Sequence, residues 1–220
     1  MTPQPPDPGL RMNDDQPHDM RSRNKQATRD AISAAALRLA LEQGPTGLKL
    51  VRVSEIASAA GVSPRTYNNY FSSREEAICA FHADQARRLG AAVRARPAGE
   101  PFATAVTAAA IEVFTNPEPD RAGLGMIMST PELQGEALKA FTLAEEPLAE
   151  AIAERTGRDL GDVACHAQAA AIAGAIRVAG RHWLSTTGAP PFAEVLSETL
   201  RHVLPTRTPT RQSWSRHDDE

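Results

Sequence analysis

The chain has 220 residues, 41% of them hydrophobic and 23% charged, and its formal net charge is −3. These values are typical of a globular protein with one large domain or two modest ones. No apolar run approaches the roughly 20 residues of a membrane span and no signal peptide is recognisable, so we expect a cytoplasmic protein with no membrane partner. The two cysteines, Cys79 and Cys165, are too few for a disulfide framework or a metal site, and their Ala-rich surroundings favour burial over a redox pair.

Charge is divided unevenly along the chain. Residues 21–96 contain 13 Lys and Arg against 6 Asp and Glu, whereas residues 97–204 contain 7 against 14. The front part therefore carries +7 and the back part −7. A polyanionic partner is expected to meet the basic front part.

Two polar segments are predicted to flank the fold. Residues 1–20 are a Pro-rich leader and residues 205–220 a polar tail, and both are expected to be disordered because they are poor in apolar residues. Between them alanine is abundant, while β-branched and aromatic residues are few, which favours helix over strand. We therefore predict an all-α protein of about nine helices.

The front part begins with a predicted helix over residues 28–43, where apolar residues recur at i, i+3, i+4 and i+7. Gly44 and the proline after it are expected to end this helix. A short helix over residues 53–60 follows, and Gly61 closes it because glycine tolerates the left-handed conformation of a sharp reversal.

A second short helix is predicted to follow Ser63, which can cap it, with Pro64 in its first turn and an end near Tyr70. Ser73 and the glutamate three positions later form a capping box for the next helix, residues 74–89.

In the back part, helices are predicted over residues 102–114, 159–184 and 192–204, and residues 131–156 are predicted to form one or two more. A Gly- and Met-containing break is expected around residues 123–129. Pro147 marks either a helix start or a kink.

Residues 53–70 have the order helix, Gly turn, helix that places a recognition helix in the DNA major groove. Arg can bind guanine and Asn adenine with two hydrogen bonds, hydroxyl groups suit phosphate oxygens, and the basic run of residues 21–29 can follow the backbone or enter the minor groove. The predicted DNA contacts are Arg23, Lys25, Arg52, Ser63, Pro64, Arg65, Thr66, Tyr67, Asn69, Tyr70 and Arg74.

Structural explanations of the same residues stay open. A short polar helix after a Gly turn occurs in many helical proteins, Tyr67 could belong to the core, and the basic run could be a solvated face. The combination of a basic run, an amphipathic first helix, a helix-turn-helix and a capped next helix favours DNA binding.

The stretch VSEIASAAGVSPRTYNNYFSSREEAI, residues 53–78, resembles the N-terminal domain of the TetR family of regulators. The elements E-I-A, A-G-V-S, T-Y-x-x-Y-F and S-R-E-E occur in the family's order and spacing. The resemblance implies a three-helix DNA-binding domain, residues 21–72, and a helical effector-binding and dimerisation domain, residues 73–204. In that family the residues that match Thr66, Tyr67, Tyr70 and Arg74 contact DNA or shape the recognition helix.

One further segment and two single positions bear on the resemblance. Residues 145–157, EEPLAEAIAERTG, are similar to the mycofactocin-type subgroup of actinobacterial regulators. Arg52 stands where the family usually has a capping Thr or Ser, so the cap must come from elsewhere, and Arg52 could instead reach a phosphate. Arg74 replaces the family's usual Lys, which keeps the charge and adds a forked donor.

Family analogy also implies a small-molecule effector bound among residues 102–184, with no metal or cofactor. The candidate lining residues are Phe114, Met126, Met128, Phe141, His166, Arg177 and Trp183. Met and Phe at helical spacing could equally be core residues. His166 and Arg177 interrupt an apolar helix, and either could pair with an acidic group such as Glu112 or Glu136 instead of a ligand.

The last two helices are predicted to form a twofold homodimer. Residues 164–180 are nearly all small, which permits close helix packing. The final helix carries an apolar stripe made of Phe192, Val195, Leu196, Leu200 and Val203. Paired recognition helices about 34 Å apart, or farther, would read palindromic double-stranded operator DNA.

These features favour a repressor that a small-molecule ligand releases from its operator. A ligand that promotes DNA binding, an activator, and a regulator without an effector remain alternatives. An enzyme is disfavoured because adjacent Cys165 and His166 would point about 100° apart on a helix, so the two side chains cannot easily act on one substrate.

Overall fold

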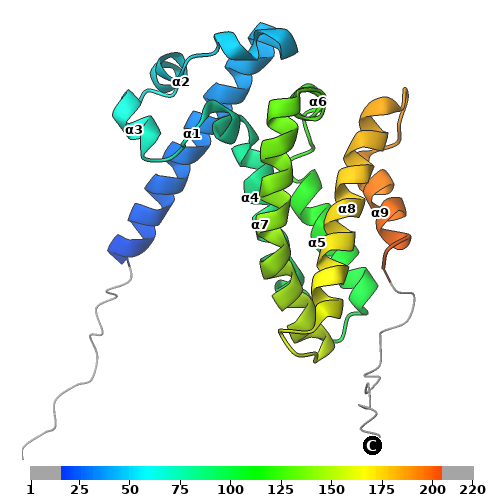
Figure 1. Ribbon diagram of the computed structural model, residues 1–220. Coiled ribbons are helices and arrows are strands. Elements are labelled where there is room, and N and C mark those ends of the chain that lie inside the picture. Colours follow the sequence, from blue (N-terminus) through cyan, green and yellow to red (C-terminus); the bar gives the residue numbers. More distant parts are fainter. Residues whose placement is uncertain (1–15, 205–220) are drawn as a thin grey trace, which may run out of the picture.

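The computed structural model describes residues 16–204, apart from the side chains of residues 16–19, 45 and 46 (Figure 1). The described part is all-α, as predicted, and contains no strand. Its helices are α1 (Gln16–Gly47), α2 (Val53–Ala59), α3 (Pro64–Asn68), α4 (Arg74–Ala95), α5 (Phe102–Thr115), α6 (Arg121–Ser129), α7 (Pro131–Thr156), α8 (Val163–Ser185) and α9 (Phe192–Arg201), with a 3-10 turn at Leu48–Leu50. Residues 1–15 of the predicted leader and the predicted tail, residues 205–220, lie outside the described residues.

The first helix starts earlier than predicted. α1 begins at Gln16 rather than near Thr28, so the basic run of residues 21–29 belongs to a helix and is mostly exposed on it. The break at Gly44 occurs where expected, with φ 69° and ψ 175°, and Gly61 has the predicted positive φ, 69°, between α2 and α3.

The break predicted around residues 123–129 is wrong, because α6 spans it. The Asp120 carboxylate caps this helix by accepting the N–H groups of Ala122 and Gly123, at 3.1 and 2.8 Å. α7 runs unbroken through Pro147, so this proline does not start a new helix.

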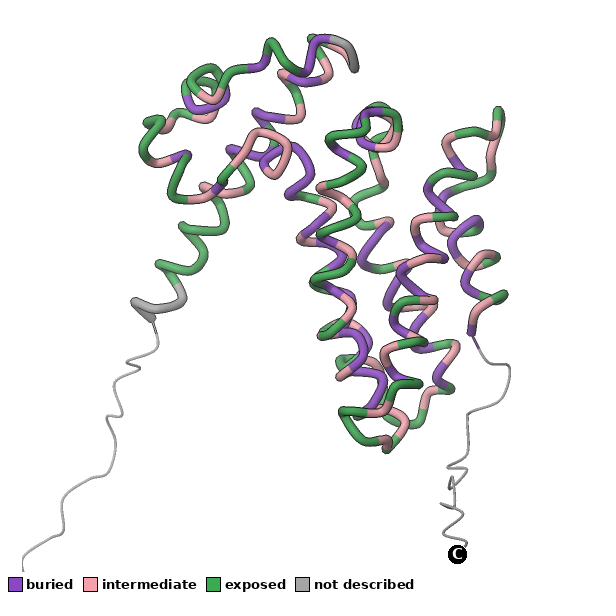
Figure 2. The backbone as a smooth tube through the Cα atoms, in the orientation of Figure 1, coloured by how far each residue is buried: buried purple, intermediate pink, exposed green. Residues whose placement is uncertain are grey.

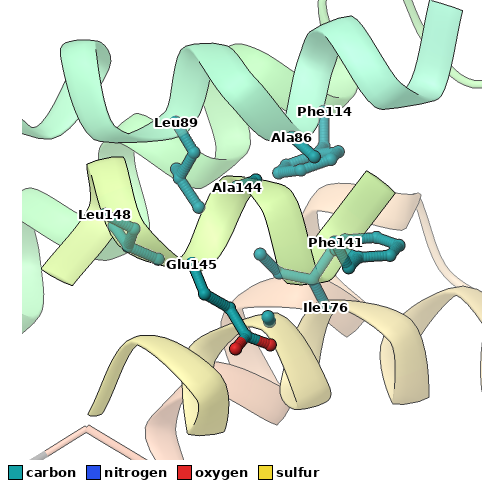
Figure 3. A pocket seen from close by; sticks show the side chains of 9 residues that line it. Ala86, Leu89, Phe114, Phe141, Ala144, Glu145, Leu148 and Ile176 are labelled. Carbon is teal, nitrogen blue, oxygen red and sulfur yellow. The ribbon is translucent and has the colours of Figure 1, made fainter. Parts of the chain in front are cut away.

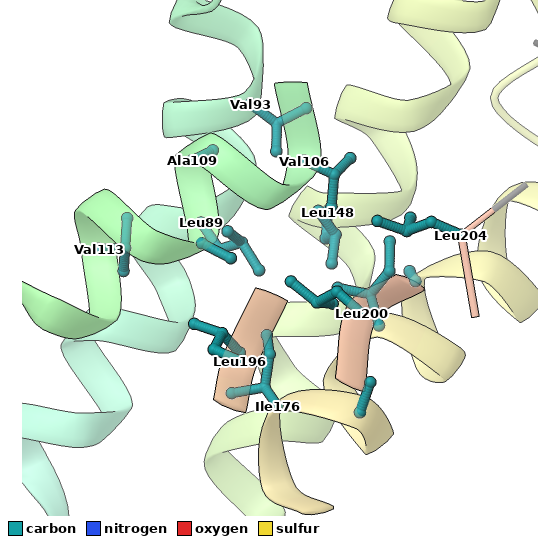
Figure 4. Close-up of a cluster of buried hydrophobic side chains, with 14 of the residues drawn as sticks. Leu89, Val93, Val106, Ala109, Val113, Leu148, Ile176, Leu196, Leu200 and Leu204 are labelled. Carbon is teal, nitrogen blue, oxygen red and sulfur yellow. The ribbon is translucent and has the colours of Figure 1, made fainter. Parts of the chain in front are cut away.

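α4 contributes to two hydrophobic cores (Figure 2). Its first half places Ile78 in a core with residues of α1, α2 and α3, and its second half places Leu89 and Val93 in a core with α5, α7, α8 and α9. Figure 4 shows Leu89 and Val93 converging with Leu148 of α7 and Leu200 of α9. One continuous helix therefore belongs to both cores.

α4 and α7 lie in close contact at a glycine. A Cβ atom on Gly90 would lie 2.6 Å from the carbonyl oxygen of Pro147, a distance that real Cβ contacts do not show. Glycine at this position therefore lets the two backbones touch.

The last two helices differ from expectation in two respects. The apolar stripe of α9 lies against the chain's own core, so it does not offer the dimer surface that the sequence predicted for it. α8 is long and apolar enough to cross a membrane by length and composition, contrary to expectation, but it packs against α7 and α9 with Ile172 and Ile176 buried.

Candidate DNA interface and effector cavity

The helix-turn-helix is built by α2, the turn at Gly61 and α3. The Ser63 hydroxyl caps α3 by accepting the Thr66 N–H at 3.0 Å, and Pro64 stands in the first turn, as predicted. α2 is capped from within, because the Glu55 carboxylate accepts the backbone N–H of Arg52 at 3.0 Å. This bond is the half of a capping box that the N3 glutamate contributes, and it satisfies the N–H of Arg52 rather than the N–H groups that a capping Ser or Thr would accept.

One face of this unit is exposed. Ser63, Pro64, Arg65 and Asn69 are exposed, and Thr66 and Tyr70 are half-buried. The other predicted contacts lie at its edges: the Arg52 side chain is exposed at the start of α2, and Arg23 and Lys25 are exposed on α1.

Tyr67 faces the other way. Its side chain is 1% exposed, its hydroxyl donates to the carbonyl oxygen of Ser73 at 2.8 Å, and its ring centre lies 5.9 Å from that of Phe71. Burial raises the pKa of this phenol to about 12. The structure thus places Tyr67 in the core, where it fixes the position of α3.

Arg74 is also tied to the protein. Its guanidinium donates to the carbonyl oxygens of Lys49 and Val51 at 3.2 and 3.1 Å and to the Glu75 carboxylate at 2.8 Å. Side-chain bonds also cap the start of α4: the Ser73 hydroxyl accepts the Glu76 N–H at 3.0 Å. Arg74 therefore joins the start of α4 to the segment before α2.

Arg29 links three elements, which the sequence did not reveal. Its guanidinium donates to the Tyr70 carbonyl oxygen at 3.2 Å, pairs with Asp84 at 3.5 Å and lies 4.4 Å from the Phe71 ring centre. In sequence it is one more residue of the basic run, and only the fold shows that it points inward.

An apolar cavity lies between α4 and residues of α5, α6, α7, α8 and α9. Its empty volume, including the open mouth, is about 550 Å³, and four of the predicted ligand residues line it: Phe114, Met128, Phe141 and Arg177. A smaller pocket of about 230 Å³ shares Phe114, Phe141 and Ile176 with it (Figure 3).

The other three predicted ligand residues lie elsewhere. Met126 is buried in the core of α1–α4. Trp183 packs on Phe192 at 5.3 Å between ring centres, and its N–H donates to the Pro190 carbonyl oxygen at 3.1 Å. His166 lies 3.5 Å from the Glu146 carboxylate, a different acid from the two considered above.

His82 and Gln85 line the cavity from α4, and sequence reasoning missed them. The Gln85 amide donates to the Val113 carbonyl oxygen at 3.0 Å, and its oxygen lies 3.2 Å from Nδ1 of His82. Desolvation by burial lowers the pKa of His82. Within residues 16–204 no group of three His, Cys, Asp or Glu side chains is arranged to hold a metal ion.

Two sequence profiles match the chain in succession. The profile described as "Bacterial regulatory proteins, tetR family" matches residues 32–77, and the profile described as "MftR C-terminal domain" matches residues 100–208. A crystal structure of a transcriptional regulator from Rhodococcus sp. Rha1 matches with a TM-score of 0.47 and 18% identity, over 80% of this chain and 95% of that one.

A curated relative is the HTH-type transcriptional regulator TcmR of Streptomyces glaucescens, which is 32% identical over 153 residues. The match covers 65% of this chain and 66% of TcmR, slightly less than two thirds of its length. With the two profiles and this relative in agreement, the chain belongs to the TetR family of bacterial transcriptional regulators.

Proposed function

We propose that the protein is a cytoplasmic, homodimeric repressor that binds palindromic operator DNA and is released by a small-molecule effector. The observation that carries the DNA-binding part is the exposed face of α3, which presents Arg65 and Asn69 on a helix held from behind by buried Tyr67. Residues 21–72 act as the DNA-binding domain and residues 73–204 as the effector and dimer domain.

Each exposed side chain has a role in this proposal. Arg65 and Asn69 read base edges, because their forked donors and acceptors match guanine and adenine. The hydroxyl groups of Ser63, Thr66 and Tyr70 bind phosphate oxygens. Positive charge at the edges of the DNA interface comes from Arg52, Arg23 and Lys25. Pro64 packs beside the sugar-phosphate backbone of the DNA.

The dimer is proposed to form through the outward face of α8. Ala167, Ala170 and Val178 are exposed on this face, while the opposite face is buried in the chain's own core. Small side chains allow a second copy of the helix to approach closely. A twofold arrangement would place two α3 helices for the two halves of a palindrome.

α4 provides the route from the cavity to the DNA-binding domain. His82 and Gln85 line the cavity, and Asp84, between them in sequence, pairs with Arg29, which also holds the Tyr70 carbonyl just after α3. An effector that prefers a shifted α4 would bias the dimer toward a spacing of α3 that does not fit DNA.

Selection of bound duplexes from a random pool tests the proposal directly. We expect the full-length protein to recover one palindromic sequence and to elute as a dimer at micromolar concentration. Recovery of no preferred sequence, or a monomeric elution profile, would contradict it. If a palindrome is recovered but no small molecule changes its affinity, the protein is a regulator without an effector.

A further inference from the structure

The cavity beside α4 combines apolar walls with a few polar side chains, which is the usual makeup of a selective small-molecule site. Its walls include Phe114, Leu124, Ile127, Met128, Phe141 and Ile176. The polar side chains are His82 and Gln85 from α4 and Arg177 from α8. Their hydrogen bonding decides which ligand the cavity can accept.

The hydrogen-bond network fixes the tautomer of His82. Since the Gln85 amide nitrogen donates to the Val113 carbonyl oxygen, its Oε1 must face Nδ1 of His82. Oε1 can only accept, so Nδ1 carries the hydrogen, and in the neutral ring Nε2 is left as an acceptor. Within residues 16–204 no group donates to Nε2.

Arg177 supplies hydrogen-bond donors and a positive charge, whereas Nε2 of His82 is an acceptor. Its side chain is half-buried in α8 and makes no hydrogen bond or ion pair with any described residue. Glu136, one of the acids considered as its partner, pairs with Lys139 instead. A partly desolvated guanidinium gains most from an anion that offers it two oxygens.

The smaller pocket beside the cavity carries a carboxylate that the cavity itself lacks. It shares Phe114, Phe141 and Ile176 with the cavity, and Glu145 lines it. In Figure 3 the Glu145 carboxylate points away from the Phe114 ring. Arg177 is the one Arg or Lys among the residues that line the cavity, so it is the group there that attracts a negatively charged ligand.

We propose that the cavity binds an anionic ligand with an apolar, ring-sized body, whose negative group pairs with Arg177 and whose hydroxyl group donates to Nε2 of His82. This proposal rests on the proposed role of the cavity as the effector site. It names the chemical class: a hydroxylated aromatic or alicyclic acid.

Three matched probes separate the contributions: naphthalene, 2-naphthol and 2-naphthoate, titrated calorimetrically into the full-length protein. We expect 2-naphthoate and 2-naphthol each to bind more tightly than naphthalene. Arg177→Gln should weaken 2-naphthoate by about 10- to 100-fold, since hydrogen bonds to charged groups are the stronger class, and leave 2-naphthol within about twofold. His82→Phe should weaken 2-naphthol by about fivefold, the range of a neutral hydrogen bond, and leave naphthalene unchanged.

Arg181→Gln is the matched control, because Arg181 is exposed one turn further along α8 and does not line the cavity. It should leave the affinities of all three probes unchanged. The inference is overturned if 2-naphthoate binds no more tightly than naphthalene, or if Arg177→Gln and Arg181→Gln act alike.

Operator release, measured on the selected palindrome by fluorescence anisotropy, distinguishes this inference from the proposed function. Selective binding of 2-naphthoate without any release supports the ligand class and contradicts release by an effector. Release by all three probes alike, unaffected by Arg177→Gln, supports the effector role and overturns the ligand class.

Discussion

The guanidinium of Arg29 lies 4.4 Å from the centre of the Phe71 ring and also donates to the carbonyl oxygen of Tyr70, 3.2 Å away. One side chain of α1 thereby holds Tyr70 and Phe71, the second and third residues after α3. Because the same guanidinium pairs with Asp84 of α4, the position of α3 depends on both helices.

Replacing Arg29 by Gln should therefore weaken operator binding without removing a DNA contact. We expect a severalfold loss of affinity in anisotropy titrations, because the cation–π contact, worth about 0.5–2 kcal/mol, and the hydrogen bond to Tyr70 are lost. Arg38→Gln is the control, since Arg38 lies on the same helix in an exposed pair with Glu42. Equal losses in both variants would mean that only net charge matters.

Arg65→Ala tests base reading by α3. We expect a loss of about 1–3 kcal/mol in binding to the selected operator and a much smaller loss on a scrambled duplex, because base contacts carry specificity. Arg88→Ala removes an exposed arginine from α4 and should affect both duplexes equally. Unchanged specificity in Arg65→Ala would refute this assignment.

Tyr67→Phe separates a structural from a DNA-contacting hydroxyl. Loss of the hydrogen bond to the Ser73 carbonyl oxygen should lower the free energy of unfolding by about 1 kcal/mol in urea titrations. Operator affinity measured well below the unfolding transition should hardly change. A variant of unaltered stability that binds operator poorly would place the hydroxyl on DNA.

His82 makes stability depend on pH in a predictable direction. Its folded pKa is lowered by burial, so below about pH 6.5 the unfolded chain takes up a proton that the folded chain resists. The full stability is present above that pH and is lost as pH falls. We expect the decrease in unfolding free energy between pH 7.5 and 5.5 to be smaller in His82→Phe than in the parent.

The groups around His82 define what this comparison measures. Gln85 accepts its Nδ1 hydrogen, Asp120 is the acidic group that favours its protonation, and Arg177 lines the same cavity. An identical pH dependence in parent and variant would show that His82 titrates normally.

Gly90→Ala should destabilise the fold, because its Cβ would lie 2.6 Å from the Pro147 carbonyl oxygen. We expect a loss of about 1–3 kcal/mol, as for other overpacked sites, measured by urea unfolding. Gly135→Ala in α7 is the control, since nothing lies within 4 Å of its Cβ and alanine favours helix by up to about 1 kcal/mol. Equal stability in the two variants would show that α4 and α7 can move apart enough to accommodate the added methyl group at little cost in free energy.

Local signals in the sequence predicted local structure well. The Ser63 cap, the Gly61 turn and the Gly44 break each depend on a few neighbouring residues, and all three occur as expected. The break near residues 123–129 was wrong because the Asp120 cap and tertiary packing outweigh the low helix propensity of two glycines.

Which way a side chain points was much harder to predict. Tyr67 is polar and adjacent to exposed residues, yet it fills the core, and Arg74 binds carbonyl groups 23 and 25 residues earlier in the chain. His82 and Gln85 could not be assigned to a cavity, because the walls opposite them come from α5, α6, α7 and α8. Such contacts require the arrangement of the helices, which periodicity does not determine.

The backbone contact between Gly90 and Pro147 can serve as a pivot point for α4. Sliding α4 past Pro147 would bring a bulkier neighbour into the space that only glycine fits, so this contact opposes sliding but not rotation about the same point. At 1.5 Å per residue, His82 lies about 12 Å and Arg74 about 24 Å along the lever arm. A displacement at the cavity would thus be doubled where α4 meets the DNA-binding helices.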